Sequence, residues 1–210
     1  MTAKASTLNS RIERTAAAFA TTLEERASEA IALWLERLQQ WNARIDLTAA
    51  RSEDELVDLM LADAMVLAPR IPAEARVVDV GTGAGAPGLA LALLRPDLRL
   101  TLVEPLAKRA AFLRTVLGTV ERADVVIERR RGEALAGRRV WDVAVSRATL
   151  APTAWLDLAV TLVRPGGSAW VLLAKDAMPG HSRAVVEEDI GYAWPLTAAC
   201  RHAVRYGVVS

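Results

Sequence analysis

Apolar residues recur at three- and four-residue steps through much of the first seventy residues. That spacing keeps side chains on one face of an α-helix. The stripe consists of Leu23, Ala27, Ala30, Ile31, Trp34, Leu38, Trp41 and Ile45. Ser52 followed by Glu55 is a capping-box pattern, which predicts a second helix that runs through Leu67 and ends before the prolines at 69 and 72. We therefore expect the chain to begin with a helical extension.

From Arg76 onward, short apolar runs alternate with helical stretches. The runs lie at 77–80, 100–103, 124–127, 140–145 and 169–174, and the helical stretches at 89–94, 106–117 and 154–163. Strand–helix alternation of this kind predicts an α/β fold, a mostly parallel sheet flanked by helices. The segment from Tyr192 to Ser210 is expected to form a terminal antiparallel hairpin. We expect two parts, residues 1–72 as the helical extension packed on the core and residues 73–210 as the α/β domain.

Composition narrows the class of protein. The chain has 210 residues, 52% hydrophobic and 24% charged, which is enough to bury a core and too apolar for a disordered chain. No apolar run approaches the ~20 residues of a membrane span, and no secretory signal is visible, so we expect no membrane association and a cytoplasmic location. One cysteine and two histidines give no zinc spacing, so no metal is expected.

Positive charge gathers in one segment although the whole chain carries only +1. Residues 95–147 hold 12 basic and 7 acidic side chains, an excess of +5. Such an excess favours a polyanionic partner, because contacts to phosphate supply much of the affinity for nucleic acid. A solvated face whose charge happens to vary explains the same numbers, so charge alone leaves both interpretations open.

The sharpest local pattern is a glycine-rich turn after a strand, Val77-Val78-Asp79-Val80-Gly81-Thr82-Gly83-Ala84-Gly85-Ala86-Pro87-Gly88. Clustered glycines let the backbone turn tightly and approach a ligand at the start of the next helix. Glu104 ends the following apolar run, where a carboxylate accepts hydrogen bonds from both ribose hydroxyls of a nucleoside cofactor. A plain tight turn is the alternative.

The acid before the first glycine discriminates between nucleoside cofactors. Asp79 suits a cationic ligand such as S-adenosylmethionine, with its sulfonium and ammonium, and repels the pyrophosphate of a dinucleotide. The chain also has no Tyr-x-x-x-Lys pair, since Leu196 and Ser210 stand four residues after its two tyrosines. We therefore favour S-adenosylmethionine over NAD(P).

Several further motifs occur in a family-specific order. They are Trp41-Asn42 with Leu47-Thr48, Asp63, the glycine turn with Pro87, Glu104 with Lys108, Arg131-Gly132-Glu133, Ser146-Arg147-Ala148, and Pro165-Gly166-Gly167 through Lys175. In these motifs, which run from about Leu33 to Lys175, the chain resembles the bacterial 16S rRNA guanine-N7 methyltransferases, the glucose-inhibited division protein B family. The resemblance implies a Rossmann-like class I methyltransferase that uses S-adenosylmethionine to methylate N7 of a guanine in ribosomal RNA, on the RNA or the small subunit, as a monomer.

The chain departs from the family pattern at four positions. Met60 replaces a histidine, Ala86 an aromatic residue, Asp46 an asparagine and Asp176 a glycine. Two alternatives stay open beside the rRNA enzyme. One is a methyltransferase that acts on a small molecule, and the other is a non-catalytic module that binds RNA or protein.

By resemblance and by position at strand ends, a set of residues is expected to bind the cofactor: Asp79, Gly81, Gly83, Gly85, Glu104, Glu133 and Arg147. The glycines line the methionine side, Glu104 holds the ribose and Glu133 borders the adenine. Arg147 is the candidate catalytic residue, in contact with the substrate and the edge of the cofactor. A structural ion pair with Asp142 or Asp63 is the alternative for Arg147, and a solvated loop acid is the alternative for Glu133.

Arg131 and Lys175 are the candidates for binding RNA. Arg131 ends the basic run 129–131, whose members would position the RNA backbone or lie exposed without a partner. Lys175 would meet a phosphate or remain a surface lysine. Trp34 and Trp41 fit core packing better than base stacking, because they share the helical stripe. Guanine N7 carries a free lone pair, so methyl transfer needs no general base, in keeping with a sequence that shows none.

Overall fold

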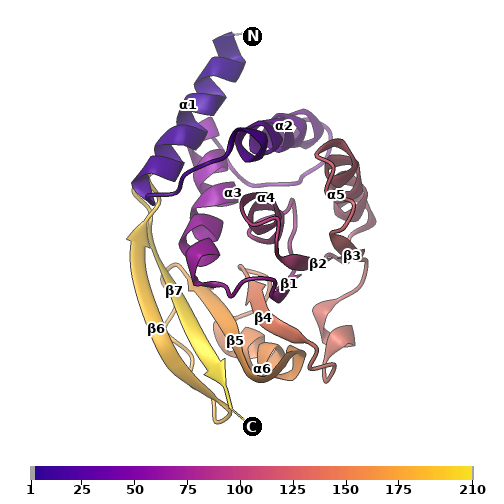
Figure 1. Cartoon of the computed structure of the whole chain (residues 1–210), viewed down its shortest axis with the longest axis vertical. Helices are drawn as coiled ribbons and strands as arrows, with labels where there is room; N and C mark the ends of the chain where they lie inside the picture. Colours follow the sequence, from indigo (N-terminus) through magenta and orange to yellow (C-terminus); the bar gives the residue numbers. More distant parts are fainter. Residues whose placement is uncertain (1–2, 210) are drawn as a thin grey trace.

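The computed structural model describes residues 3–209, which form a seven-stranded sheet in the order β3-β2-β1-β4-β5-β7-β6 (Figure 1). The strands are β1 (Arg76–Val80), β2 (Arg99–Val103), β3 (Val126–Glu128), β4 (Trp141–Ser146), β5 (Val163–Leu173), β6 (Ala184–Ala193) and β7 (Cys200–Val208). The first five pair in parallel, and β7 pairs antiparallel with both β5 and β6. The predicted α/β class and the terminal hairpin are confirmed.

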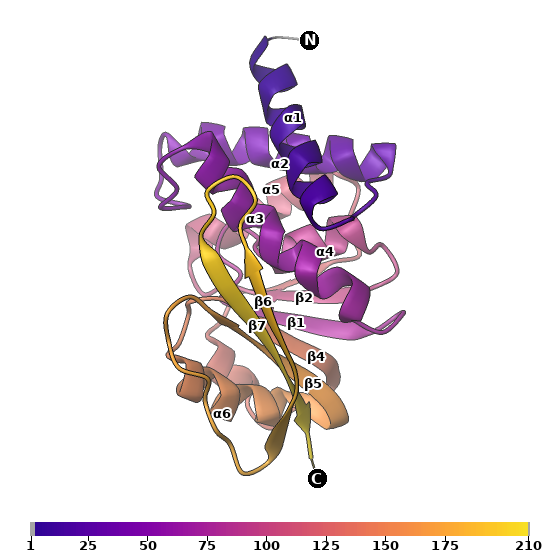
Figure 2. The same cartoon turned by 90° about the vertical axis from the view of Figure 1, so that its left-hand side faces the viewer.

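Helices cover both faces of this sheet. They are α1 (Ala3–Ala18), α2 (Glu25–Asn42), α3 (Glu53–Leu67), α4 (Gly88–Leu94), α5 (Ala107–Thr119) and α6 (Pro152–Leu162), with short 3-10 turns η1 (Ala68–Arg70) and η2 (Gly132–Leu135). Helices α2 to α5 lie on one face and α6 on the other (Figures 1 and 2). Within residues 3–209, none of the helices is both long enough and apolar enough to span a bilayer. The arrangement is Rossmann-like.

Two strands extend further than their patterns predict. β5 begins at Val163 rather than 169, and includes the glycines at 166 and 167. β6 begins at Ala184, whereas the expected hairpin begins at Tyr192. β6 lies at one edge of the sheet and carries Glu187, Glu188 and Asp189. Because charges are common on exposed sheet edges and mask the alternation of a strand, the sequence underestimates β6.

The capping pattern before α3 forms as predicted. The Glu55 backbone N–H donates to Ser52 Oγ at 3.1 Å, and the Glu55 carboxylate accepts from the backbone N–H of Arg51 at 2.8 Å. Both bonds satisfy donors near the helix start that have no partner within the helix. They fix where α3 begins, and α3 then contributes an almost fully buried segment to the core.

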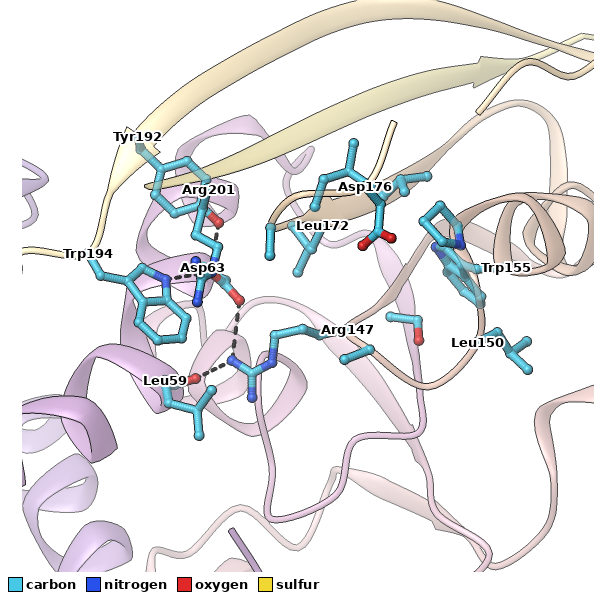
Figure 3. A pocket seen from close by; sticks show the side chains of 16 residues that line it. Leu59, Asp63, Arg147, Leu150, Trp155, Leu172, Asp176, Tyr192, Trp194 and Arg201 are labelled. Carbon is cyan, nitrogen blue, oxygen red and sulfur yellow. Dashed lines mark hydrogen bonds and ion pairs between the residues drawn. The ribbon is translucent and has the colours of Figure 1, made fainter. Parts of the chain in front are cut away.

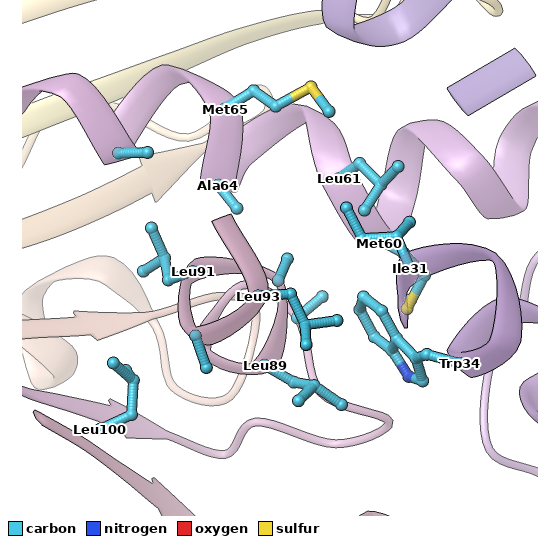
Figure 4. Close-up of a cluster of buried hydrophobic side chains, with 14 of the residues drawn as sticks. Ile31, Trp34, Met60, Leu61, Ala64, Met65, Leu89, Leu91, Leu93 and Leu100 are labelled. Carbon is cyan, nitrogen blue, oxygen red and sulfur yellow. The ribbon is translucent and has the colours of Figure 1, made fainter. Parts of the chain in front are cut away.

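The N-terminal helices share one hydrophobic cluster with the sheet. Figure 4 shows Ile31 and Trp34 of α2 and Met60 of α3 packed near Leu89 of α4. Trp34 is fully buried, and its indole Nε1 donates to the carbonyl oxygen of Ala84 at 3.0 Å. Trp41 is partly buried and meets Phe112 edge-on, with 5.5 Å between ring centroids. Core packing is thus the role of both tryptophans, and Trp34 also fixes the glycine turn.

We expect Trp34→Phe to lower the free energy of unfolding by about 1–3 kcal/mol, because it leaves the buried carbonyl of Ala84 without its donor. Chemical denaturation measures this. Trp41→Phe is the matched control, since no hydrogen bond of its indole is seen among the described contacts. Equal losses in the two variants would show that the hydrogen bond to Ala84 contributes nothing.

Candidate active site

The glycine turn leaves the end of β1 and folds back against β2. The backbone N–H groups of Gly81 and Thr82 both donate to the carbonyl of Val103, at 2.8 and 3.2 Å. Gly81 has φ +73°, and a Cβ there would lie 2.0 Å from Oγ1 of Thr149. Only glycine tolerates both the conformation and the close approach. The turn is therefore held between β2 and the loop after β4.

Asp79 lies behind the turn. It is fully buried, and its Oδ2 accepts the backbone N–H of Gly88 at 2.7 Å, at the start of α4. Oδ1 has no hydrogen-bond partner within the described part of the chain. Burial raises the pKa of Asp79 to about 6, against the opposing effects of the neighbouring Thr82 side chain and of the Gly88 N–H. Asp79 is not among the described residues that line the cavity in front of the turn, and it holds the turn from behind. Its expected part in cofactor binding stays a prediction.

Glu104 faces the front of the turn. This residue comes directly after β2 and is only 2% exposed. Oε2 accepts from the backbone N–H of Gly83 at 3.1 Å, and Oε1 accepts from that of Leu106 at 2.8 Å. Each carboxylate oxygen keeps a free lone pair. Two backbone bonds thus fix a carboxylate at the carboxyl end of a central strand, where open α/β sheets bind ligands.

A cavity of about 920 Å³ opens in front of these residues. Its walls include Gly81, Gly83, Glu104, Arg131, Glu133 and Arg147. The predicted set is therefore brought together except for Asp79 and Gly85. Gly85 has φ +117°, and a Cβ there would point inward, 2.8 Å from Cβ of Leu89 and 3.0 Å from the Trp34 ring. Its expected place beside the cofactor stays a prediction.

Arg147 is anchored by an ion pair. Its Nη1 lies 3.2 Å from Asp63 Oδ2 and also donates to the carbonyl of Leu59. The arginine side chain is 18% exposed and that of Asp63 only 3%. The other oxygen of Asp63 accepts from Tyr192 Oη at 2.6 Å and from Trp194 Nε1 at 3.3 Å. The alternative foreseen for Arg147, a pair with Asp63, is thus present, and Arg147 lines the cavity as well.

A second, smaller pocket of about 210 Å³ lies beside the cavity (Figure 3). The two share four residues, Leu59, Arg147, Ala148 and Leu150. Ala148 has φ +51°, a conformation that is costly for a residue with a side chain and is frequent at functional sites. The loop after β4 is therefore the partition between the two spaces.

Two of the remaining candidate residues lie at the exposed rim of the cavity, and a third lies outside both spaces. Arg131 and Glu133 line the cavity and are exposed to solvent. Lys175 is exposed in the bend after β5 and is not among the described residues that line either space. In the basic run, Arg130 pairs with Glu128 at 2.7 Å, so this arginine has a partner.

Three residues of the small pocket gave no sequence signal. Tyr192, Trp194 and Arg201 come from the C-terminal hairpin, and Arg201 lies over the Trp194 ring at 4.0 Å from its centroid. Burial, together with the adjacent Asp63, holds the pKa of the Tyr192 hydroxyl well above its usual range, so it remains a donor to Asp63. Arg109, also missed, lines the large cavity, and its buried Nε has no hydrogen-bond partner within residues 3–209. A helical pattern does not reveal which of its polar residues faces a cavity.

Comparison with known proteins identifies the family. The model of GidB, rRNA small subunit methyltransferase G, matches residues 27–184. The chain belongs to the GidB family. The match covers the glycine turn, Glu104, the loop after β4 and Lys175, so the resemblance inferred from the motifs is confirmed.

Individual GidB relatives cover much of the chain. This chain is 41% identical over 161 residues to ribosomal RNA small subunit methyltransferase G of Nocardioides sp.. The match spans 77% of this chain and 58% of the relative. The protein of the same name from Xanthomonas axonopodis pv. citri is 34% identical over 178 residues, 84% of this chain and 82% of the relative.

Solved structures support the fold of this GidB protein. MtNAS in complex with MTA and tNA has a TM-score of 0.59 at 14% identity and covers 88% of this chain and 73% of its own. TYW2 of P. horikoshii in complex with MeSAdo has a TM-score of 0.57 at 12% identity, with 80% and 66% covered. At such identities the likeness concerns the fold alone.

Asp79 predicts an unusual pH dependence of stability. Its pKa is about 6 in the folded protein and 3.8 when exposed, so the native state binds the proton more tightly between these values. The contribution of Asp79 to the free energy of unfolding thus falls by about 2 kcal/mol as pH rises from 4 to 6. We expect Asp79→Asn, which still accepts from Gly88, to lack this fall in urea denaturation at pH 4 to 7.

Asp97→Asn is the matched control with the opposite sign. The hydrogen bond from Arg95 lowers the pKa of Asp97 to about 2, so its stabilising contribution is present above pH 3.8 and is lost only as pH falls toward 2. We expect this variant to be less stable by a similar amount across pH 4 to 7. If the free energy of unfolding of Asp79→Asn changed with pH as much as that of the wild type, Asp79 would not be the source of the pH dependence.

Proposed function

We propose that this protein transfers a methyl group from S-adenosylmethionine to N7 of a guanine in 16S ribosomal RNA. The observation that carries the proposal is the buried carboxylate of Glu104, which faces a large cavity beside a glycine turn in a chain of the GidB family. A ribosomal substrate implies action in the cytoplasm.

The residues of the cavity fit such a cofactor. Its volume of about 920 Å³ lies near the upper end for small-molecule sites. Glu104 would accept both ribose hydroxyls with the lone pairs that its backbone bonds leave free. Gly81 and Gly83 would allow close approach of the methionine part, and Thr82 lines the same wall. Glu133 would border the adenine.

The chemistry leaves the protein mainly a task of positioning. The bound cofactor supplies an electrophilic methyl group on a sulfonium. Because N7 carries no proton, the chain has to orient the base, exclude water and hold the cofactor, and no general base is required. Arg147, fixed by Asp63 and placed on the partition between cavity and pocket, is the residue we propose to contact the base.

RNA would approach across the rim of the cavity. Arg131 lines it and is exposed, and Lys175 lies in the neighbouring bend after β5. Exposed cations at such positions contact phosphates and fix the register of an RNA strand. Met60 and Ala86, two of the positions that depart from the family pattern, also line the cavity. For this reason a small-molecule acceptor is the alternative that the experiment has to distinguish from RNA.

The direct test is methyl transfer. We expect the purified protein to transfer labelled methyl groups to small ribosomal subunits, or to their RNA, from a strain that lacks its own enzyme. Nucleoside mass spectrometry then detects 7-methylguanosine. Binding of the cofactor with transfer only to a metabolite pool would favour the small-molecule alternative, and binding without any transfer would favour the non-catalytic one.

Glu104→Gln tests the cofactor site within that assay. The variant keeps the size of the side chain but removes the charge, so we expect the affinity for S-adenosylmethionine to fall about 10- to 100-fold by calorimetry. Glu133→Gln, at an exposed position, is expected to change affinity less than threefold. Unchanged affinity in Glu104→Gln would remove Glu104 from the ribose.

Arg147 variants separate its two roles. Arg147→Lys keeps a cation beside Asp63, so we expect the free energy of unfolding to change by less than about 1 kcal/mol while kcat falls about 10- to 100-fold, because the planar fork is lost. Arg147→Met leaves Asp63 without a cation, and we expect it to cost about 2 kcal/mol or more. Full activity of Arg147→Lys would leave Arg147 a purely structural residue.

A further inference from the structure

The small pocket beside the cavity has the size and polarity of a site for a single base. Its volume is about 210 Å³, against about 920 Å³ for the cavity that would hold the cofactor. Trp155, Leu150 and Pro152 supply an apolar wall, and the Trp155 indole N–H is already bonded to the carbonyl of Trp170 at 2.8 Å. Enzymes that act on a splayed-out base bind it between apolar or aromatic surfaces and read its polar edge.

Two carboxylates line this pocket, and only one is already engaged. Asp63 uses its oxygens for Arg147, Tyr192 and Trp194. Asp176 is exposed in the bend after β5, and no hydrogen bond or ion pair of its side chain occurs among residues 3–209. Figure 3 shows its carboxylate directed into the pocket. The pocket thus presents a free acceptor with two oxygens.

The positions of donor and acceptor match guanine in one orientation. Methylation at N7 requires the N7 edge to reach the cofactor cavity directly, at the residues of the loop after β4 that line both spaces. O6 lies beside N7 and accepts hydrogen bonds, and Arg147 on the partition is a donor. The N1–H and N2–H₂ donors lie on the other side of the purine, where Asp176, which lines only the small pocket, is an acceptor.

On this basis, and resting on the proposed function, we propose that Asp176, which stands where the family pattern has a glycine, adds selectivity for guanine by accepting hydrogen bonds from N1–H and N2–H₂ of the base in the small pocket. Adenine is rejected at both ends. Its N6–H₂ group meets the donor Arg147, and its N1, an acceptor, meets the carboxylate. A buried or desolvated mismatch of this kind discriminates more strongly than the loss of an apolar contact.

The test removes the N2 amino group from the base and the carboxylate from Asp176, separately and together. Small-subunit RNA is ligated with either guanosine or inosine, which lacks only the N2 amino group, at the nucleotide that the wild-type protein methylates. We expect inosine to lower kcat/KM of the wild type about tenfold, the effect of one hydrogen bond to a charged group. In Asp176→Ala we expect kcat/KM on guanosine to fall about 30-fold and the two RNAs to differ by less than twofold.

Two controls make the result specific. Asp157→Asn removes the same charge from α6, a helix that contributes to the pocket wall. Asp157 pairs with His181 and does not line the pocket, so we expect this variant to retain the wild-type preference for guanosine. Asp176→Asn keeps the side-chain size and is expected to show an intermediate preference. Calorimetry is expected to give all three variants the cofactor affinity of the wild type, within twofold.

The outcomes are distinguishable. A tenfold preference for guanosine that survives in Asp176→Ala would overturn the role of Asp176 while leaving the proposed function intact. A wild-type protein that binds S-adenosylmethionine and forms no 7-methylguanosine would overturn the proposed function and this inference with it. Loss of the preference in Asp176→Ala, with its retention in Asp157→Asn, would support both.

Discussion

A buried carboxylate has to find hydrogen-bond donors, and this requirement shapes the whole site. Four buried acids occur in residues 3–209, namely Asp58, Asp63, Asp79 and Glu104. Asp79 and Glu104 bind backbone N–H groups behind and in front of the glycine turn. Asp58 accepts from the backbone of Leu196 and Thr197, and Asp63 binds Tyr192, so that both attach the C-terminal hairpin to α3. Asp58, Asp63 and Glu104 thus join segments that are distant along the chain, and Asp79 joins the two ends of the glycine turn.

Much of the fold follows from local patterns. The central strands β1, β2 and β4 are continuous apolar runs because both of their faces are covered, and such runs are readable in a single sequence. The edge strand β6 is not, because solvent permits charges along it. The N-terminal helices were expected to pack on the core, and one cluster of buried side chains includes members of α2, α3 and α4. The boundary at residue 72 stays a prediction.

The site was predictable where it depends on order along the chain, and unpredictable where it depends on distance through space. Gly81, Gly83, Glu104 and Arg147 follow strand ends, and parallel strands bring those ends to one edge. The bond between Asp63 and Tyr192 spans 129 positions, and no periodicity announces it. Asp79 has the residue type expected of a ligand, yet its side chain points toward the start of α4. Successive side chains of a strand point to opposite faces, so a shift of one residue decides which face a side chain takes.

The position of β7 in the sheet has a consequence for biosynthesis. β7 is translated after all the other strands, yet it lies between β5 and β6. A nascent chain that has emerged only as far as β6 therefore presents an open β5 edge, and its Tyr192 is not yet aligned with its cross-strand neighbour Arg201. The small pocket that we propose as the base site is thus completed late in vectorial synthesis, after the core around β1 has had time to form.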